Sequence, residues 1–352
     1  MDAKITKKRL GDFLSYEWVK VLAIAVALIM LWSLLFSTTA TRLTNDQVFT
    51  VINYTGTTVG TGFDKYLNLP VDGSLFSYEV YEIGAVDTET QGGTYAGVLL
   101  ETRLSTGEGD VMFVADAEQP NSQWAVTDAD GNPVLGEDGN PTYETDTYLR
   151  GFLNGTYYHN VLPLEDVVEG LYGLKKGLLT LIDEYLSQFY VKNSTERFDY
   201  ADGINVTETE RLFRERIAEM KDKRFKTEAQ IQAGLQQEIV RIERYRAAMD
   251  EYLQNVADGY LAPTESKLVF SDDDGNPLVI NGQFGLNLCP DEEKMPGLKE
   301  DVFYYMTSAD DKQVMTAKNV NMVFLNLEGS QPEFLCEKIL FVNYLVKEHK
   351  AV

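Results

Sequence analysis

An uninterrupted apolar stretch near the N-terminus is the feature that most constrains this chain. Residues 21–41 contain no charged side chain, and residues 21–36 are almost wholly apolar. The hydrocarbon core of a bilayer needs a helix of about 20 apolar residues. Trp18 and Lys20 stand just before the stretch, where interfacial anchors are usually found. The sequence therefore predicts a transmembrane helix at residues 21–41, preceded by a basic segment at residues 1–20.

Basic residues predict the orientation of this helix. Five of them lie within residues 4–20, whereas only Arg42 follows the apolar stretch closely. The positive-inside rule then places the N-terminus in the cytoplasm. We expect a single-pass protein of the cell membrane whose C-terminal domain is extracytoplasmic. Two alternatives stay open: a signal peptide cleaved after residues 38–40, and a buried helix of a soluble fold.

Charge and cysteine content narrow the class of protein. The chain has a net charge of −24, and residues 1–42 hold six basic and three acidic side chains, so the remainder carries about −27. Nucleic acid is an unfavourable partner for such a surface, because phosphate binding needs basic patches. Only Cys289 and Cys336 occur, which excludes a disulfide-rich scaffold. One disulfide and two free thiols both remain compatible with their spacing.

The chain after the apolar stretch alternates between strand and helix patterns. We expect strands at residues 47–54, 75–83 and 110–115, and a helix at residues 94–105. A strand, a helix and a strand in succession predict parallel pairing. Two Asp-Gly-Asn-Pro turns, at residues 130–133 and 138–141, predict a hairpin insert. Residues 42–160 are therefore expected to form a first α/β lobe.

The middle of the chain, residues 161–260, has a helical pattern. Apolar residues spaced by three or four predict a helix from Leu171 to Phe189. Thr207 with Glu210, and Thr227 with Gln230, resemble capping boxes that begin two further helices, the second ending near residue 258. Their outer faces are rich in Glu and Arg. These helices are expected either to form a solvated bundle within the domain or to serve as an arm that docks a partner.

The last part of the chain, residues 261–352, returns to strands and ends in a helix. The clearest strands lie at residues 278–288 and 321–327. Ser330 and Glu333 predict a capping box, and apolar residues at helical spacing follow from Phe334 to Val346. We expect this segment to complete the α/β domain.

Motifs for catalysis and metal binding are missing from the sequence. The two histidines, His159 and His349, lie far apart, and there is no Cys-x-x-Cys pair. A Gly-x-Ser-x-Gly elbow is also missing. We therefore expect a protein that is not an enzyme and that binds no metal or cofactor. A hydrolase of the cell envelope with two facing carboxylates is the least favoured hypothesis.

Three segments together resemble a known family. They are the strand at residues 48–54, the turn and strand at residues 104–114, and the final helix at residues 332–345. In this order they resemble the extracellular solute-binding proteins of ATP-driven importers, of which the chain looks like a degenerate relative. Gly109 stands where many members have proline. The resemblance implies a two-lobed, type 2 periplasmic-binding fold that binds a solute and works with a membrane permease.

A two-lobed fold also predicts where a ligand would bind. The cleft of such a fold lies at the carboxyl ends of its parallel strands. Tyr54, Thr57 and Thr58 follow the first strand, Asp116 follows the strand at 110–115, and Trp124 comes next. Aromatic rings and carboxylates suit a small neutral ligand such as a sugar. The alternative is a structural or interaction protein of the cell envelope that holds a partner with its helical segment.

Overall fold

The computed structural model describes residues 7–39, 48–54, 75–76, 82–88, 95–115, 119–125, 128, 132–136, 139–140, 143–146, 149, 153, 156–168, 173–271, 277–290, 295–299, 305–307, 313–315, 320–326 and 332–351. The chain divides into two compact units, Met1–Thr44 and Asn45–Val352. Each unit is described by itself.

The first unit contains one helix, α1 (Lys7–Thr39). Within the described part of the chain, no helix is both long enough and apolar enough to cross a membrane. The predicted transmembrane helix is therefore wrong, as are the single-pass localisation and the cytoplasmic N-terminus derived from it. The residues predicted to span form only part of α1, which begins fourteen residues earlier and includes the charged residues Lys7, Asp12, Glu17 and Lys20.

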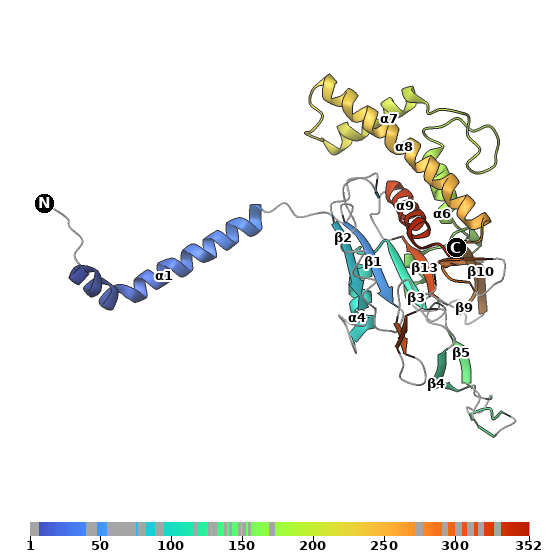
Figure 1. The fold of residues 1–352 in the computed structure, drawn as a ribbon, viewed down its shortest axis with the longest axis horizontal. Helices are drawn as coiled ribbons and strands as arrows, with labels where there is room; N and C mark the ends of the chain where they lie inside the picture. The colour runs from blue at the N-terminus through green and yellow to red at the C-terminus, as the bar shows by residue number, and fades with distance from the viewer. Residues whose placement is uncertain are drawn as a thin grey trace. The chain divides into compact units, whose positions relative to one another are not determined.

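The second unit is built on one mixed sheet (Figure 1). Its strand order is β2-β1-β3-β13-β10-β9, with β6 pairing on β13. The strands are β1 (Val48–Tyr54), β2 (Glu82–Asp87), β3 (Val111–Ala115), β6 (Val161–Leu162), β9 (Ala262–Ser271), β10 (Pro277–Asn287) and β13 (Val320–Leu325). β1 pairs in parallel with both β2 and β3, which confirms the expected parallel unit, and the other pairings are antiparallel.

Both faces of this sheet are buried, and the strand period of two sorts the side chains between them. Phe49, Val51 and Phe113 belong to one core cluster, whereas Ile52 and Met112 belong to a second. The helices α6 (Leu178–Leu186), α8 (Glu228–Ala257) and α9 (Pro332–His349) contribute to the first cluster. α4 (Ala96–Ser105) contributes to the second. In Figure 1, α9 lies between the sheet and α8.

The remaining elements are a helical hairpin and several short pieces. α7 (Val206–Met220) packs against α8. The short elements are β4 (Gln119–Ala125), β5 (Tyr143–Asp146), η3 (Thr156–Asn160), β7 (Val167–Val168), β8 (Leu174–Lys175), β11 (Tyr305–Thr307) and β12 (Gln313–Met315). The mixed α/β character that the sequence predicts is therefore present.

Several local predictions need correction. Leu75 and Phe76 lie outside the strands but are buried, and β2 begins only at Glu82. The first of the middle helices starts later than expected, because Leu174 lies in β8 and α6 begins at Leu178. Asn205, and not Thr207, caps α7 by accepting a hydrogen bond from the Glu208 amide. The box of Thr227 and Gln230 is confirmed, whereas Ser330 lies outside the described residues.

The two-lobed architecture is also wrong. Residues of Asn45–Val352 form one compact unit, because β13 near the C-terminus pairs with β3 from the first half and with β10 from the second. Among the described residues no disulfide joins Cys289 to Cys336: Cys336 is buried and Cys289 is half-buried.

Candidate functional site

The predicted ligand site lies mostly outside the described residues. Thr57, Thr58 and Asp116 are not among them, and Trp124 lies in β4 without a described side chain. Tyr54 ends β1, is half-buried and packs against the second core cluster. The structure therefore does not test whether these five residues come together.

Polar side chains gather at the edge of the sheet where this site was predicted. Asn53 of β1 donates from Nδ2 to Oδ1 of Asp87 at 3.2 Å, and the Thr88 hydroxyl donates to the Asn53 carbonyl at 2.8 Å. Asn321, the second residue of β13, lies at the same edge and accepts a hydrogen bond from the Thr264 hydroxyl. Asn53 Oδ1 and Asn321 Nδ2 are buried without a hydrogen-bond partner among the described residues. Such atoms are costly to leave unpaired.

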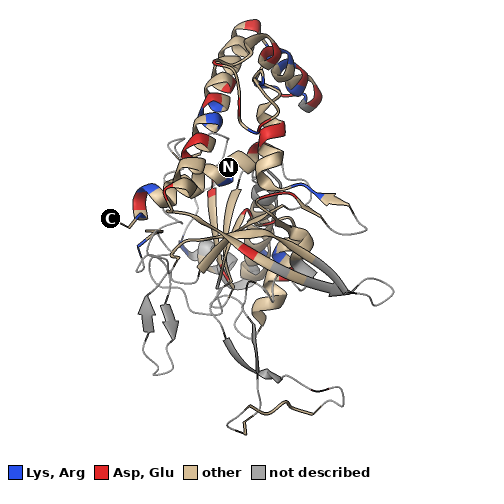
Figure 2. Cartoon of the chain, turned by 90° about the vertical axis from the view of Figure 1, so that its right-hand side faces the viewer, with Lys and Arg blue, Asp and Glu red and all other residues tan. Residues whose placement is uncertain are grey.

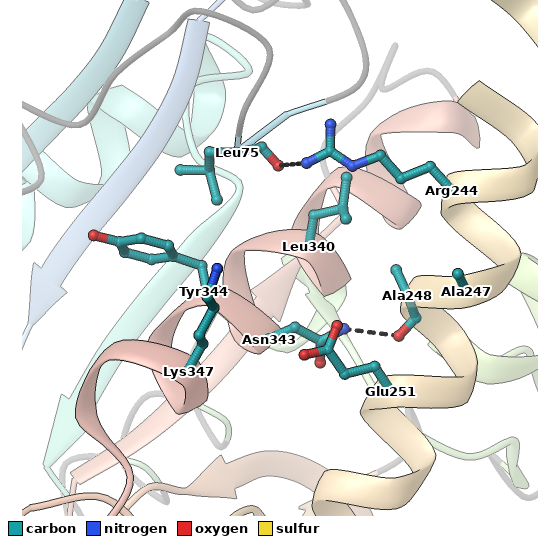
Figure 3. A pocket seen from close by; sticks show the side chains of 9 residues that line it. All are labelled: Leu75, Arg244, Ala247, Ala248, Glu251, Leu340, Asn343, Tyr344 and Lys347. Atoms are coloured by element: carbon teal, nitrogen blue, oxygen red, sulfur yellow. Dashed lines mark hydrogen bonds between the residues drawn. The ribbon is translucent and has the colours of Figure 1, made fainter. Parts of the chain in front are cut away.

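A groove of about 200 Å³ runs between α8 and α9 (Figure 3). It is smaller than most ligand sites, which measure about 300–1,000 Å³. Arg244 reaches across it and donates to the carbonyls of Leu75, at 2.9 Å, and of Phe76, at 3.2 Å. Asn343 donates to the Ala248 carbonyl at 2.8 Å. The polar groups of the groove thus join α8 to α9 and to the Leu75–Phe76 segment, so the groove is better explained as a structural contact.

A more distinctive feature is the hairpin formed by α7, the turn at residues 221–227 and α8, which we call the arm. A cluster of charged side chains, three of them buried and Arg216 half-buried, links both of its helices to α9. Arg216 of α7 contacts Glu238 of α8 at 2.8 Å and Glu333 of α9 at 3.4 Å. Arg241 contacts Glu238 at 2.6 Å. We call these four residues the arm mount. They hold two helices against a third through groups that are distant in sequence.

The electrostatics of the arm mount are consistent with ionised groups. Burial alone would disfavour a charged Glu238, but the guanidinium groups of Arg241 and Arg216 outweigh it and lower the pKa of this carboxyl. One turn further along α9, buried Glu337 accepts a hydrogen bond from Tyr245 of α8. Burial, and then the Glu337 carboxylate, raise the pKa of Tyr245, which therefore stays protonated.

The outer part of the arm packs on itself. Phe213 and Leu235 are buried but belong to neither core cluster of the sheet. Phe225 from the turn lies edge-on to Phe213, with ring centroids 5.3 Å apart. Gly234 makes room for it, because a Cβ at this position would lie 2.4 Å from the Phe225 ring. The end of the arm therefore has its own small apolar centre.

Basic and acidic residues are interspersed along α7 and α8, as the blue and red segments of the ribbon show (Figure 2). Arg211 pairs with Glu208 at 2.5 Å and with Glu215 at 2.6 Å. Arg214 pairs with Glu210 at 2.8 Å, as their spacing predicts, and with Glu228 across the hairpin. Each exposed pair stabilises the arm little, and the carboxylates in these pairs outnumber the arginines, so the sides of the arm stay acidic.

The turn of the arm was missed by the sequence analysis. Residues 221–226 read Lys-Asp-Lys-Arg-Phe-Lys, which is four basic residues and one acidic residue in six. A count of charge in short windows would have found this cluster. It was overlooked because the helices on either side are charged as well.

Comparisons with protein-family models, curated proteins and solved structures found no match to this chain. The geometry of its own residues must therefore carry any statement about function.

Proposed function

We propose that this chain is a non-catalytic interaction protein that holds a protein partner against its arm. The observation that carries the proposal is the arm mount. A buried ionic cluster stabilises a fold no better than apolar side chains of similar size, and its best-attested use is to fix one arrangement. Arg216, Glu238 and Glu333 come from three different helices, so they fix the direction of the arm relative to α9.

A fixed arm favours binding for a physical reason. Association costs free energy when it orders loops and side chains, and a surface that is already ordered avoids part of this cost. The two helices are joined by a turn with a capping box at Thr227 and an apolar contact at Phe225. The arm can therefore present a helical surface without first folding.

The arm offers exposed apolar side chains between its charged groups. Val206 is 48% exposed and Val240 is 63% exposed. Helical surfaces that combine apolar contacts with a charged surround are typical of protein-binding faces.

Photo-crosslinking in the cells that make the protein would test this proposal. A photoreactive amino acid would replace Val206 or Val240 on the arm. Val98 on α4 and Val168 on β7, at 60% and 65% exposure, are matched controls outside the arm. We expect a discrete covalent adduct to another protein from the arm positions and none from the controls. The same adducts from all four positions, or no adduct from either arm position, would refute the proposal.

A second candidate function is the binding of a small neutral polar ligand at the edge of the sheet. It is supported by Asn53 Oδ1 and Asn321 Nδ2, an acceptor and a donor without a described partner. Sugar hydroxyls can both donate and accept hydrogen bonds. Calorimetry against a carbohydrate panel would test it, with Tyr54→Ala and Asn53→Ala as variants. A binding enthalpy that is unchanged in both variants would remove this edge from consideration.

A further inference from the structure

The turn of the arm carries a concentration of positive charge in an acidic protein. Residues 221–226 have a net charge of +3, whereas the whole chain has −24, so all other residues together carry −27. Lys221, Lys223, Arg224 and Lys226 are all exposed. We call this cluster the basic tip.

The backbone of the basic tip is fixed by hydrogen bonds. The Lys221 amide donates to the Ala218 carbonyl at 3.3 Å, and the Arg224 amide donates to Asp222 Oδ1 at 2.9 Å. The amides of Lys226 and Thr227 both donate to Gln230 Oε1 at 3.0 Å. The cations are therefore displayed on a defined turn.

Side-chain packing at Phe225 and the left-handed backbone of Lys221 also constrain the basic tip. The Arg224 guanidinium stacks over Phe225, 5.5 Å from the ring centroid, and Phe225 is seated above Gly234. Lys221 has a φ of 51°, in the left-handed region that glycine or asparagine usually occupies at a helix end. A lysine is thus held where stability alone favours glycine, and unfavourable backbone conformations of this kind cluster at functional sites.

Charge pairing distinguishes the tip from the sides of the arm. Arg211 and Arg214 each have two carboxylate partners. Among the residues placed by the structure, Lys221, Lys223 and Lys226 have no ion-pair partner within 4.0 Å. Their charge remains available to an external anion.

From these observations we infer that the basic tip binds a cluster of carboxylates on the protein partner. The inference rests on the proposed function and names the chemistry of the partner. A short acidic segment has the charge opposite to that of the tip, and its small size limits its contact with the acidic remainder of the chain. Such complementarity accelerates association and selects partners more than it adds affinity.

Other polyanions fit the tip less well. Nucleic acid binding uses many phosphate contacts along an extended surface, but exposed Glu215, Glu219 and Glu228 flank the turn. A lipid surface is broad and would bring these carboxylates close to anionic headgroups. A short acidic peptide segment avoids both problems.

Fluorescence anisotropy with a labelled oligoglutamate peptide and the full chain would test the inference. The tip variant carries Lys221→Glu, Lys223→Glu and Lys226→Glu together. These side chains are exposed, so the variant should fold. We expect binding that weakens with salt and that falls by roughly tenfold or more in the tip variant, because like charges then face the peptide.

A matched control separates local charge from net charge. Lys176→Glu, Lys299→Glu and Lys347→Glu, three exposed lysines outside the tip, produce the same change in net charge. We expect this variant to bind the peptide within about threefold of the unaltered chain. Equal losses in both variants, or no binding by the unaltered chain, would overturn the inference. So would tighter binding of duplex DNA or phosphatidylserine vesicles than of the peptide.

The crosslinking experiment distinguishes failure of this inference from failure of the proposed function. If the Val240 adduct forms in the tip variant as strongly as in the unaltered chain, the arm binds its partner without the basic tip. Loss of the adduct in the tip variant, with retention in the matched control, would support both statements.

Discussion

Replacement of Glu238 by glutamine tests the arm mount directly. Glu238 is 6% exposed and pairs with Arg216 and with Arg241, which is 8% exposed. Glutamine keeps the shape of the side chain but removes its charge, so Arg241 is left buried without this carboxylate. Removal of one member of a buried ion pair typically costs about 3–5 kcal/mol. We expect Glu238→Gln to reduce the free energy of unfolding by this amount.

Urea denaturation followed by circular dichroism would measure the effect, since urea does not screen charge as guanidinium does. Glu228→Gln is the matched control, because Glu228 also lies on α8 and also pairs with an arginine of α7, but its side chain is 63% exposed. We expect little or no change in the control. A Glu238→Gln protein whose urea midpoint matches that of the control would show that the mount is not a buried ionic cluster.

Three further predictions concern other parts of the fold. Lys338 is fully buried 3.7 Å from Asp110, so Lys338→Met should destabilise by about 3–5 kcal/mol, and adding Asp110→Asn should recover part of this loss in urea denaturation. Gly234→Ala places a methyl group against Phe225; we expect faster proteolysis within residues 221–227, although alanine favours helices. Because the pKa of Glu238 is lowered from 4.5 in the folded chain, its stabilisation is present above pH 4.5 and is lost as the pH falls below this value. The unfolding free energy should therefore fall more steeply on acidification in the unaltered chain than in Glu238→Gln.

Elements with a clear local pattern could be predicted from the sequence. β1, β3, α4 and α8 lie close to their expected positions, because strand alternation, helix periodicity and the Thr227 box act over a few residues. Segments whose burial depends on distant partners could not be predicted. The segment that begins at Leu75 has a strand-like composition, but Leu75 lies outside the strands and is buried. Its carbonyl accepts a hydrogen bond from Arg244, which lies 169 residues further along the chain.

The same distinction applies to the candidate site. Glu238 and Arg241 lie in a charged sequence that predicts a solvated face, yet both are buried. Their partners come from α7 and α9, so no local pattern indicates the pairing. The resemblance to solute-binding proteins remains a prediction, because most of the residues that would form the ligand site lie outside the described part of the chain.

The position of β13 has a consequence for synthesis of the chain. This strand is made long after β3, yet it lies inside the sheet between β3 and β10. Until residue 325 leaves the ribosome, β3 has an open edge that can pair with other chains. Contacts between residues so far apart form slowly, and α9 must follow before the first core cluster is closed. The sheet is therefore expected to close only after β13 and α9 have both been made, and a chain cut before β13 should aggregate rather than fold.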